Sequence, residues 1–141
     1  MTAGQILRKL WELVAERKVE EAIGLLDPDG KFWSPPIGYI PMEALIYMMR
    51  EVQGIAPLTF AVRSVMEEGD RAMIEMQGHG VFPGGEVYEN NYVYIADIRD
   101  GVIYELREYD NYIYSSGVFE RNLPPEVRKT FADVVAKANA A

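Results

Sequence analysis

The sequence contains no cysteine and a single histidine, His79, among its 141 residues. Without cysteine the chain has no disulfide, no thiolate nucleophile and no zinc–thiolate site. A single histidine excludes every metal centre that needs two imidazole ligands. We therefore expect a fold that is held together by its apolar core, and a chemistry that uses no metal and no cofactor.

Basic residues and long apolar runs are scarce as well. The chain carries 14 lysines and arginines against 22 acidic residues, and its net charge of −8 repels polyanions, so nucleic acid is not an expected partner. The longest apolar run, Ala44 to Met49, is far shorter than the roughly 20 residues that span a bilayer. No basic segment precedes an apolar core near the start. We expect no signal peptide, no membrane partner and a cytoplasmic location.

Apolar residues at helical spacing predict helices in the first third of the chain and at its C-terminal end. The first helix has one apolar stripe that includes Ile6, Leu10 and Val14. Further helices are predicted over about residues 19–26 and from Pro41 to Gly54, with a terminal helix that begins at Pro124–Pro125.

From Leu58 onward the apolar pattern changes to a period of two, which is typical of strands. Short turns separate the predicted strands, so consecutive strands should be antiparallel neighbours. The predicted strands cover about residues 59–67, 71–82, 86–98 and 102–114, and a short extended piece covers 31–34.

This order predicts an α+β fold, in which three N-terminal helices pack on one face of a curved antiparallel sheet. If the sheet curls, the sheet and helices form a cone with an apolar pocket at its mouth. We expect a single domain over residues 1–141, with a core of about residues 5–120 and a helical extension over 124–141.

A motif near the end of the predicted sheet resembles that of SnoaL-like, ketosteroid-isomerase-related proteins of the nuclear-transport-factor-2-like superfamily. Its parts are Tyr88-Glu89-Asn90-Asn91-Tyr92, then Asp100-Gly101-Val102-Ile103, then Arg107-Glu108-Tyr109, with Trp33-Ser34-Pro35 as the loop before the third helix. The sequence departs from the family's pattern at one point: Asp110 follows Tyr109 directly, whereas the family usually has an aromatic or aliphatic residue between the tyrosine and the acid. The resemblance implies a cone fold, often a homodimer through the outer sheet face, and a cavity used by isomerases, cyclases, epoxide hydrolases and plain binders.

Two of the chemistries known for such proteins find few matching residues here. The resemblance places Ser34 where ketosteroid isomerase has its carboxylate base, Leu10 where it has a tyrosine, and Asn90 or Tyr94 where it has an acid. The epoxide-hydrolase Arg-x-Asp pair would fall on the uncharged stretch 76–78.

Among the chemistries of these proteins, that of the SnoaL-like cyclases conflicts least with the residues present here. The resemblance places their single acid on Glu108, and a pocket histidine on the second strand would match His79. A carboxyl group with a raised pKa can take a proton from a carbon next to a carbonyl or return one. The alternative for Glu108 is a solvated or salt-bridged sheet residue, and the alternative for His79, which lies between two glycines, is a role in packing.

Strand alternation leaves two questions of orientation open. The row Glu75, Gln77 and His79 either lines the cavity or faces solvent while the apolar residues between them fill the core. On the next strand, alternation favours the aliphatic face of Val93 inward, whereas the resemblance favours Asn90 and Tyr92 inward.

The first hypothesis is a cytoplasmic protein that binds a small apolar carbonyl compound and transfers a proton on it. Glu108 would be the acid or base, and His79, Asn90 and Tyr92 would polarise or orient the substrate. The rivals are a binder without catalysis and a dimeric interaction module whose cone is filled. The expected ligand contacts are Glu75, Trp33, Ser34, Tyr39, Met49 and Asp110, and the expected surface or dimer contacts are Tyr112 and Tyr114.

Overall fold

The first segment folds as its capping residues and apolar stripe predict. A computed structural model describes residues 1–140. Helix α1 (Ala3–Ala15) starts at Thr2, whose hydroxyl accepts a hydrogen bond from the Gln5 backbone while the Gln5 side chain accepts one from the Thr2 backbone. Its apolar stripe is fully buried at Leu7 and Leu10 and packs on strands β3 and β4. The short helix α2 (Val19–Ile23) then returns the chain toward the sheet.

Six strands form one sheet in the order β2-β1-β6-β5-β4-β3. Neighbouring strands are antiparallel, with one exception: β1 runs parallel to β6. The α+β class is confirmed, but the expectation of a purely antiparallel sheet is wrong at this pair. The strands are β1 (Leu26–Ser34), β2 (Gly38–Pro41), β3 (Thr59–Glu68), β4 (Arg71–Val81), β5 (Val87–Arg99) and β6 (Val102–Asp110).

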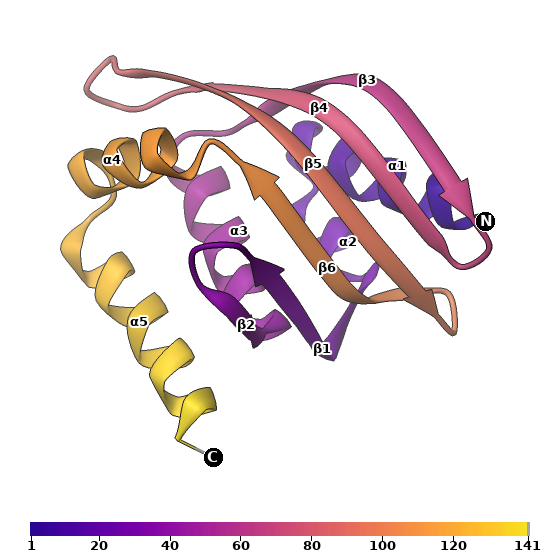
Figure 1. The fold of residues 1–141 in the computed structure, drawn as a ribbon. Coiled ribbons are helices and arrows are strands. Elements are labelled where there is room, and N and C mark those ends of the chain that lie inside the picture. The colour runs from indigo at the N-terminus through magenta and orange to yellow at the C-terminus, as the bar shows by residue number, and fades with distance from the viewer. Residues whose placement is uncertain (141) are drawn as a thin grey trace.

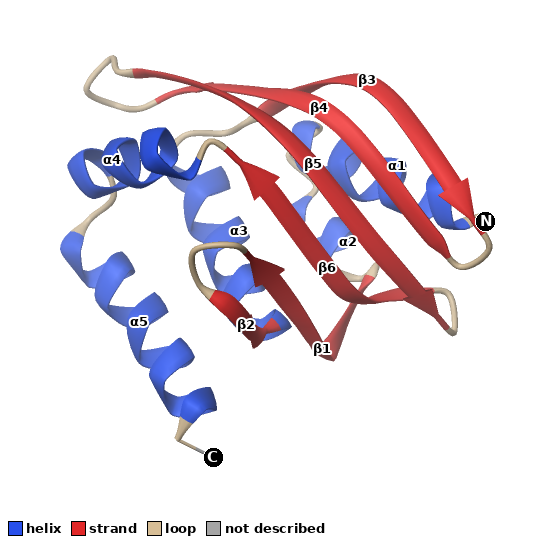
Figure 2. Cartoon of the chain, in the orientation of Figure 1, coloured by secondary structure: helices blue, strands red, loops and turns tan. Residues whose placement is uncertain are grey.

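The sheet curves around helices α1 and α3 (Met42–Ile55), which cover its inner face (Figures 1 and 2). Register shifts between Val62 and Ser64 and between Asp97 and Ile98 mark bulges, which bend strands. Two C-terminal helices, α4 (Tyr112–Asn122) and α5 (Pro125–Asn139), lie at one end of the sheet, and α5 packs on α3 and β2. The result is the curved sheet with helices on one face that the sequence predicts.

Three segments differ from the sequence prediction. The second helix ends at Ile23 because the chain has already joined the sheet at Leu26, which pairs with Ile103. The stretch after β1, expected as a stiff loop, contains β2, which pairs with β1 as a hairpin. The last strand ends at Asp110 rather than near Tyr114, because the Asn111 side chain caps α4 by accepting a hydrogen bond from the Tyr114 backbone at 3.4 Å.

No helix within residues 1–140 is long and apolar enough to cross a bilayer. The cytoplasmic location expected from the sequence stays a prediction.

Candidate active site

A cavity of about 440 Å³ lies between the inner face of the sheet and helices α3, α4 and α5. Its wall is mainly aromatic and aliphatic, and the cavity contradicts the rival hypothesis of a filled cone: Phe60 forms part of the wall and does not plug the space. Apolar walls with a few converging polar groups are typical of small-molecule sites. Six residues of the apolar wall are Trp11, Phe32, Met49, Phe60, Phe119 and Phe131.

Glu108 is the central polar residue of this cavity. It lies on β6 at the inner side of the sheet, opposite Tyr94 of β5, whose hydroxyl donates a hydrogen bond to a Glu108 carboxylate oxygen. The pKa of Glu108 is raised to about 7, mainly by burial and also by the negative charge of Asp110, while the Tyr94 hydrogen bond opposes the rise. At neutral pH this carboxyl group therefore exists in both protonation states.

Asp110, two residues further on the same strand face, is a second carboxyl group of the cavity wall. Its Oδ2 accepts hydrogen bonds from Asn90 Nδ2 at 3.1 Å and from Ser115 Oγ at 3.2 Å. Burial raises the pKa of Asp110, and these two hydrogen bonds work against that rise. Asp110 is thus held in place by β5 and α4 beside Glu108, where its charge acts on the Glu108 pKa.

Asn90 lies behind the cavity wall and is buried, with 2% of its surface exposed. Its Oδ1 accepts hydrogen bonds from the backbone nitrogens of Asn91 at 2.8 Å and Asn111 at 3.2 Å, which fixes the orientation of the amide group. The Nδ2 group must then point the other way, and it donates to Tyr88 at 3.0 Å as well as to Asp110.

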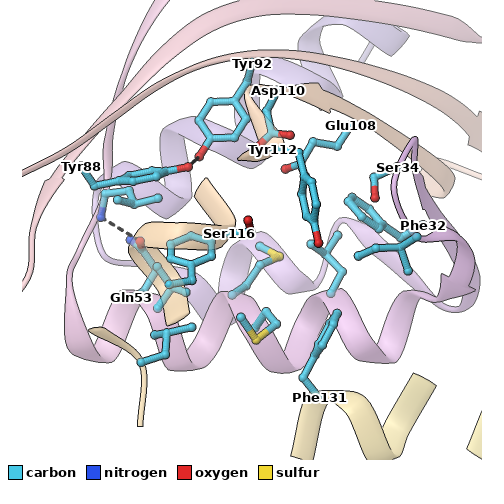
Figure 3. A pocket seen from close by; sticks show the side chains of 18 of the residues that line it. Phe32, Ser34, Gln53, Tyr88, Tyr92, Glu108, Asp110, Tyr112, Ser116 and Phe131 are labelled. Atoms are coloured by element: carbon cyan, nitrogen blue, oxygen red, sulfur yellow. Dashed lines mark hydrogen bonds between the residues drawn. The ribbon is translucent and has the colours of Figure 1, made fainter. Parts of the chain in front are cut away.

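The hydroxyl groups of Tyr88 and Tyr92 form a hydrogen-bonded pair in the cavity wall (Figure 3). The pair has two phenolic hydrogens, and its mutual bond uses one of them. Because Asn90 already donates to Tyr88, cooperativity favours Tyr88 as donor and Tyr92 as acceptor. The hydrogen of Tyr92 is then left for an acceptor in the cavity. Burial raises the pKa of both phenols, so both stay protonated.

Four of the expected site residues lie outside the cavity, on the outer face of the sheet. On β4 the inward positions are taken by buried residues such as Ile74 and Met76, so Glu75 and His79 face solvent. The His79 side chain is 51% exposed and lies 3.8 Å from Glu89. The expectation that His79 and Glu75 line the cavity is wrong for this reason.

Trp33 and Tyr39 were also expected to contact the ligand, and this expectation is wrong as well. Phe32, Ser34 and Ile40 point inward from β1 and β2, which turns their neighbours Trp33 and Tyr39 outward. The guanidinium group of Arg107 lies 3.8 Å from the Trp33 ring centroid. Trp33 therefore belongs to an outer-face cluster and does not line the cavity.

The remaining expected residues are brought together. Ser34, Met49, Tyr92, Glu108 and Asp110 line the cavity, and Asn90 supports two of its polar groups from behind. Their chemical roles stay predictions.

Sequence reasoning missed the contributions of Tyr88 and Tyr112. Tyr88 shares the inward face of β5 with Asn90 and Tyr92, and this period of two was the available signal. Tyr112 was expected at the surface, because its segment reads as strand; it is 43% exposed and also lines the cavity from α4. Tyr114, also expected at the surface, is partly buried: its hydroxyl accepts from the Glu89 backbone at 3.1 Å, and its ring stacks on Tyr88.

Across residues 1–140 no group of three histidine or carboxylate side chains is close enough to hold a metal ion. The polar groups of the cavity wall near Glu108 are carboxyl groups, phenols and aliphatic hydroxyls. It can exchange a proton near neutrality through Glu108 and can donate a hydrogen bond through the tyrosine pair.

Fold and site together define a class: a curved α+β sheet around a cavity with a titratable carboxyl group on its last strand. A family model described as SnoaL-like domain matches residues 7–106. The chain belongs to this family of SnoaL-like domains.

Several solved structures have the same fold. A candidate polyketide cyclase from Pseudomonas putida KT2440 is 19% identical, with a TM-score of 0.71 over 82% of this chain and 96% of that one. A candidate isomerase from Bacillus subtilis is 23% identical, with a TM-score of 0.71 over 84% and 92%. AclR, a candidate hydroxylase from Streptomyces galilaeus, is 17% identical, with a TM-score of 0.73 over 86% and 97%. No curated protein matches the sequence significantly.

Proposed function

We propose that this protein is a cofactor-independent isomerase or cyclase that transfers a proton on a small apolar carbonyl compound, with Glu108 as its acid and base. The observation that carries the proposal is Glu108 itself, a carboxyl group in the wall of an apolar cavity with a pKa of about 7. A general acid–base catalyst is most effective when its pKa lies near the working pH. The candidate cyclase and isomerase of the same fold point in the same direction.

The first step is removal of a proton from the carbon next to the substrate carbonyl. The ionised Glu108 takes this proton, and the electron pair of the broken C–H bond moves to the carbonyl oxygen, which becomes an enolate. The free hydrogen of the Tyr88–Tyr92 pair donates to that oxygen, because both phenols line the same cavity (Figure 3). A preorganised donor aimed at a developing negative charge lowers the barrier.

The second step returns the proton from Glu108. In the isomerisation of a β,γ-unsaturated carbonyl compound the enolate is conjugated with the second double bond, and the proton goes to its γ-carbon, so that the double bond moves next to the carbonyl. In a cyclisation the enolate carbon attacks a second carbonyl of the same molecule, and the proton goes to the new alkoxide. Either way Glu108 ends ionised, as it began, and no oxidant or reductant is consumed.

Deuterium exchange tests this chemistry without knowledge of the natural substrate. β-Tetralone is a small aromatic ketone, and NMR in heavy water follows deuterium entering the carbon beside its carbonyl. The wild-type protein should accelerate this exchange, and Glu108→Gln should reduce the acceleration by about a hundredfold or more. Tyr92→Phe should reduce it by about tenfold or more, since it removes the hydrogen-bond donor.

The matched control is Glu75→Gln, which removes the same charge from the outer face of the same sheet. It should leave exchange at the wild-type rate. Exchange that is equally fast in Glu108→Gln and wild type would remove Glu108 from the mechanism. Binding of tetralone without any acceleration would favour the alternative of a non-catalytic binder.

A further inference from the structure

The rim of the cavity carries a cation that no carboxylate within residues 1–140 neutralises. Arg128 of α5 lines the cavity and is exposed to solvent. Four other arginines form salt bridges, with carboxylates 2.7 to 3.6 Å away, whereas none joins Arg128 to an acidic residue. These four are Arg50, Arg71, Arg107 and Arg121. Other arginines, such as Arg63, form no salt bridge either, but within residues 1–140 Arg128 is the one cationic side chain that lines the cavity, where its charge is available to a ligand.

The positive charge of Arg128 does not stabilise the helix to which it belongs. Arg128 is in the first turns of α5, which begins at Pro125. The N-terminal end of a helix carries a partial positive charge, so a cation there is electrostatically unfavourable for the helix. Pro124 at the N-cap supplies no side-chain acceptor for the free backbone N–H groups. Helix and guanidinium therefore both add positive potential to this part of the rim.

The chemistry of the cavity differs from one side to the other. Figure 3 shows Phe131, one turn beyond Arg128 on α5, across the cavity from Tyr92 and Asp110. Apolar side chains such as Met49 line the space between. A ligand that fills the cavity would place one polar group near the tyrosine pair and the other end near α5.

We propose that the substrate of this site is an apolar carbonyl compound that also bears a carboxylate, which Arg128 binds at the rim while the carbonyl lies at Tyr92 and Glu108. This inference rests on the proposed function and adds the charge of the substrate to it. The planar guanidinium group suits a carboxylate because two parallel N–H groups can meet its two oxygens. A chain with a net charge of −8 repels anions elsewhere, so one free cation at the rim would also orient the ligand.

Glu120 of α4 lies on the same rim and carries the opposite charge. It forms no salt bridge with Arg128 within the described chain, and its carboxylate should repel an anionic ligand. The proposal therefore makes two opposite predictions for two rim residues: loss of Arg128 weakens the binding of an anion, and loss of Glu120 strengthens it.

Two pyrene probes separate charge recognition from apolar binding. Pyrenebutyrate carries a carboxylate, and pyrenebutanol carries a neutral hydroxyl on the same skeleton. Fluorescence titration of the full chain should give an about fivefold weaker affinity for pyrenebutyrate in Arg128→Gln and an unchanged affinity for pyrenebutanol. Glu120→Gln should bind pyrenebutyrate more tightly than wild type does, again with pyrenebutanol unchanged.

The matched control is Lys129→Gln, because Lys129 is the next residue of α5 but pairs with Asp133 and does not line the cavity. It should leave both affinities at the wild-type value. The proposal is overturned if Arg128→Gln binds pyrenebutyrate as wild type does, if it loses both probes equally, or if wild type binds neither. The tetralone assay tests proton transfer with Glu108 and Tyr92 variants, and the pyrene assay tests charge recognition with Arg128 and Glu120 variants, so failure of either proposal is recognised separately.

Discussion

Glu108 is ionisable, and its ionised form is less stable in the folded cavity than in the unfolded chain. Its pKa is about 7 in the fold against an ordinary value of 4.5, so the folded protein binds the extra proton between these two values. Stability therefore falls as pH rises through this interval, by about 3 kcal/mol in total. Such a cost is typical of a group that is retained for chemistry.

The substitution Glu108→Gln should remove this cost, because glutamine resembles the protonated acid and can still accept the hydrogen bond from Tyr94. Urea unfolding should give nearly equal free energies for the two proteins near pH 4 and a variant more stable by about 3 kcal/mol near pH 8. Asp110, whose pKa is also raised, keeps titrating in both proteins and cancels in the difference. A difference that stays the same across this range would place Glu108 in solvent.

Strand alternation shows which residues share a face of the sheet but not which face lies inside, so single site residues could be predicted only in part. The motif resemblance placed Glu108 in the cavity and, against alternation, Tyr92 as well, and both line it. The same resemblance also suggested His79, whereas alternation left open which face of β4 is inside. The burial of Ile74 and Met76 settles that question, and it depends on packing against elements far away in the sequence.

Gly78 and Gly80, on either side of His79, affect how strand β4 packs as an element. They allow the β4 backbone to lie close to aromatic and aliphatic side chains on the inner face. A Cβ on Gly78 would lie 2.9 Å from the Tyr92 ring and 3.2 Å from Phe60, and one on Gly80 would lie 2.6 Å from Leu58. Strand β4 thus makes room for the ring that carries the proposed hydrogen-bond donor.

Gly78→Ala should push the Tyr92 ring away from β4. We expect a loss of stability of about 1–3 kcal/mol from overpacking, and slower tetralone exchange because the Tyr92 hydroxyl moves with its ring. Thermal unfolding and the exchange assay measure the two effects. Gly84→Ala, in the exposed turn after β4 with nothing within 4 Å of its Cβ, should change neither. Wild-type values in both assays for Gly78→Ala would mean that the ring is free to move elsewhere.

The elements that sequence reasoning could not place are those that depend on distant partners. The parallel pairing of β1 with β6 joins segments about 75 residues apart, and no local pattern encodes it. The segment from Tyr112 to Tyr114 has the composition of a strand, yet it forms the start of α4. There the Asn111 cap and the packing of Phe119 on Phe82 and Tyr88 outweigh intrinsic propensity.

At the scale of the whole molecule, the outer face of the sheet is the apolar surface least covered by the chain itself. Nine large hydrophobic side chains within residues 1–140 are exposed, and five of them belong to outward positions of the strands, which concentrates them on one face. The five are Tyr39, Met66, Val81, Val87 and Tyr109. Trp33 and Arg107 stack on this face as well. The homodimer expected from the sequence stays a prediction, and this face is where it should form.

Ile95 lies near the middle of that face, between Met73 of β4 and Arg107 of β6. Sedimentation velocity at micromolar concentration should give a dimer for the wild type and a monomer for Ile95→Glu, because a buried unpaired carboxylate is costly at an interface. The control is Ile113→Glu on α4, which charges a residue that is 87% exposed away from the sheet and should stay dimeric. A wild-type monomer would contradict the prediction, and a dimer retained by Ile95→Glu would move the interface to another surface. Because the cavity opens on the opposite side of the sheet, either oligomeric state leaves Glu108 accessible to substrate.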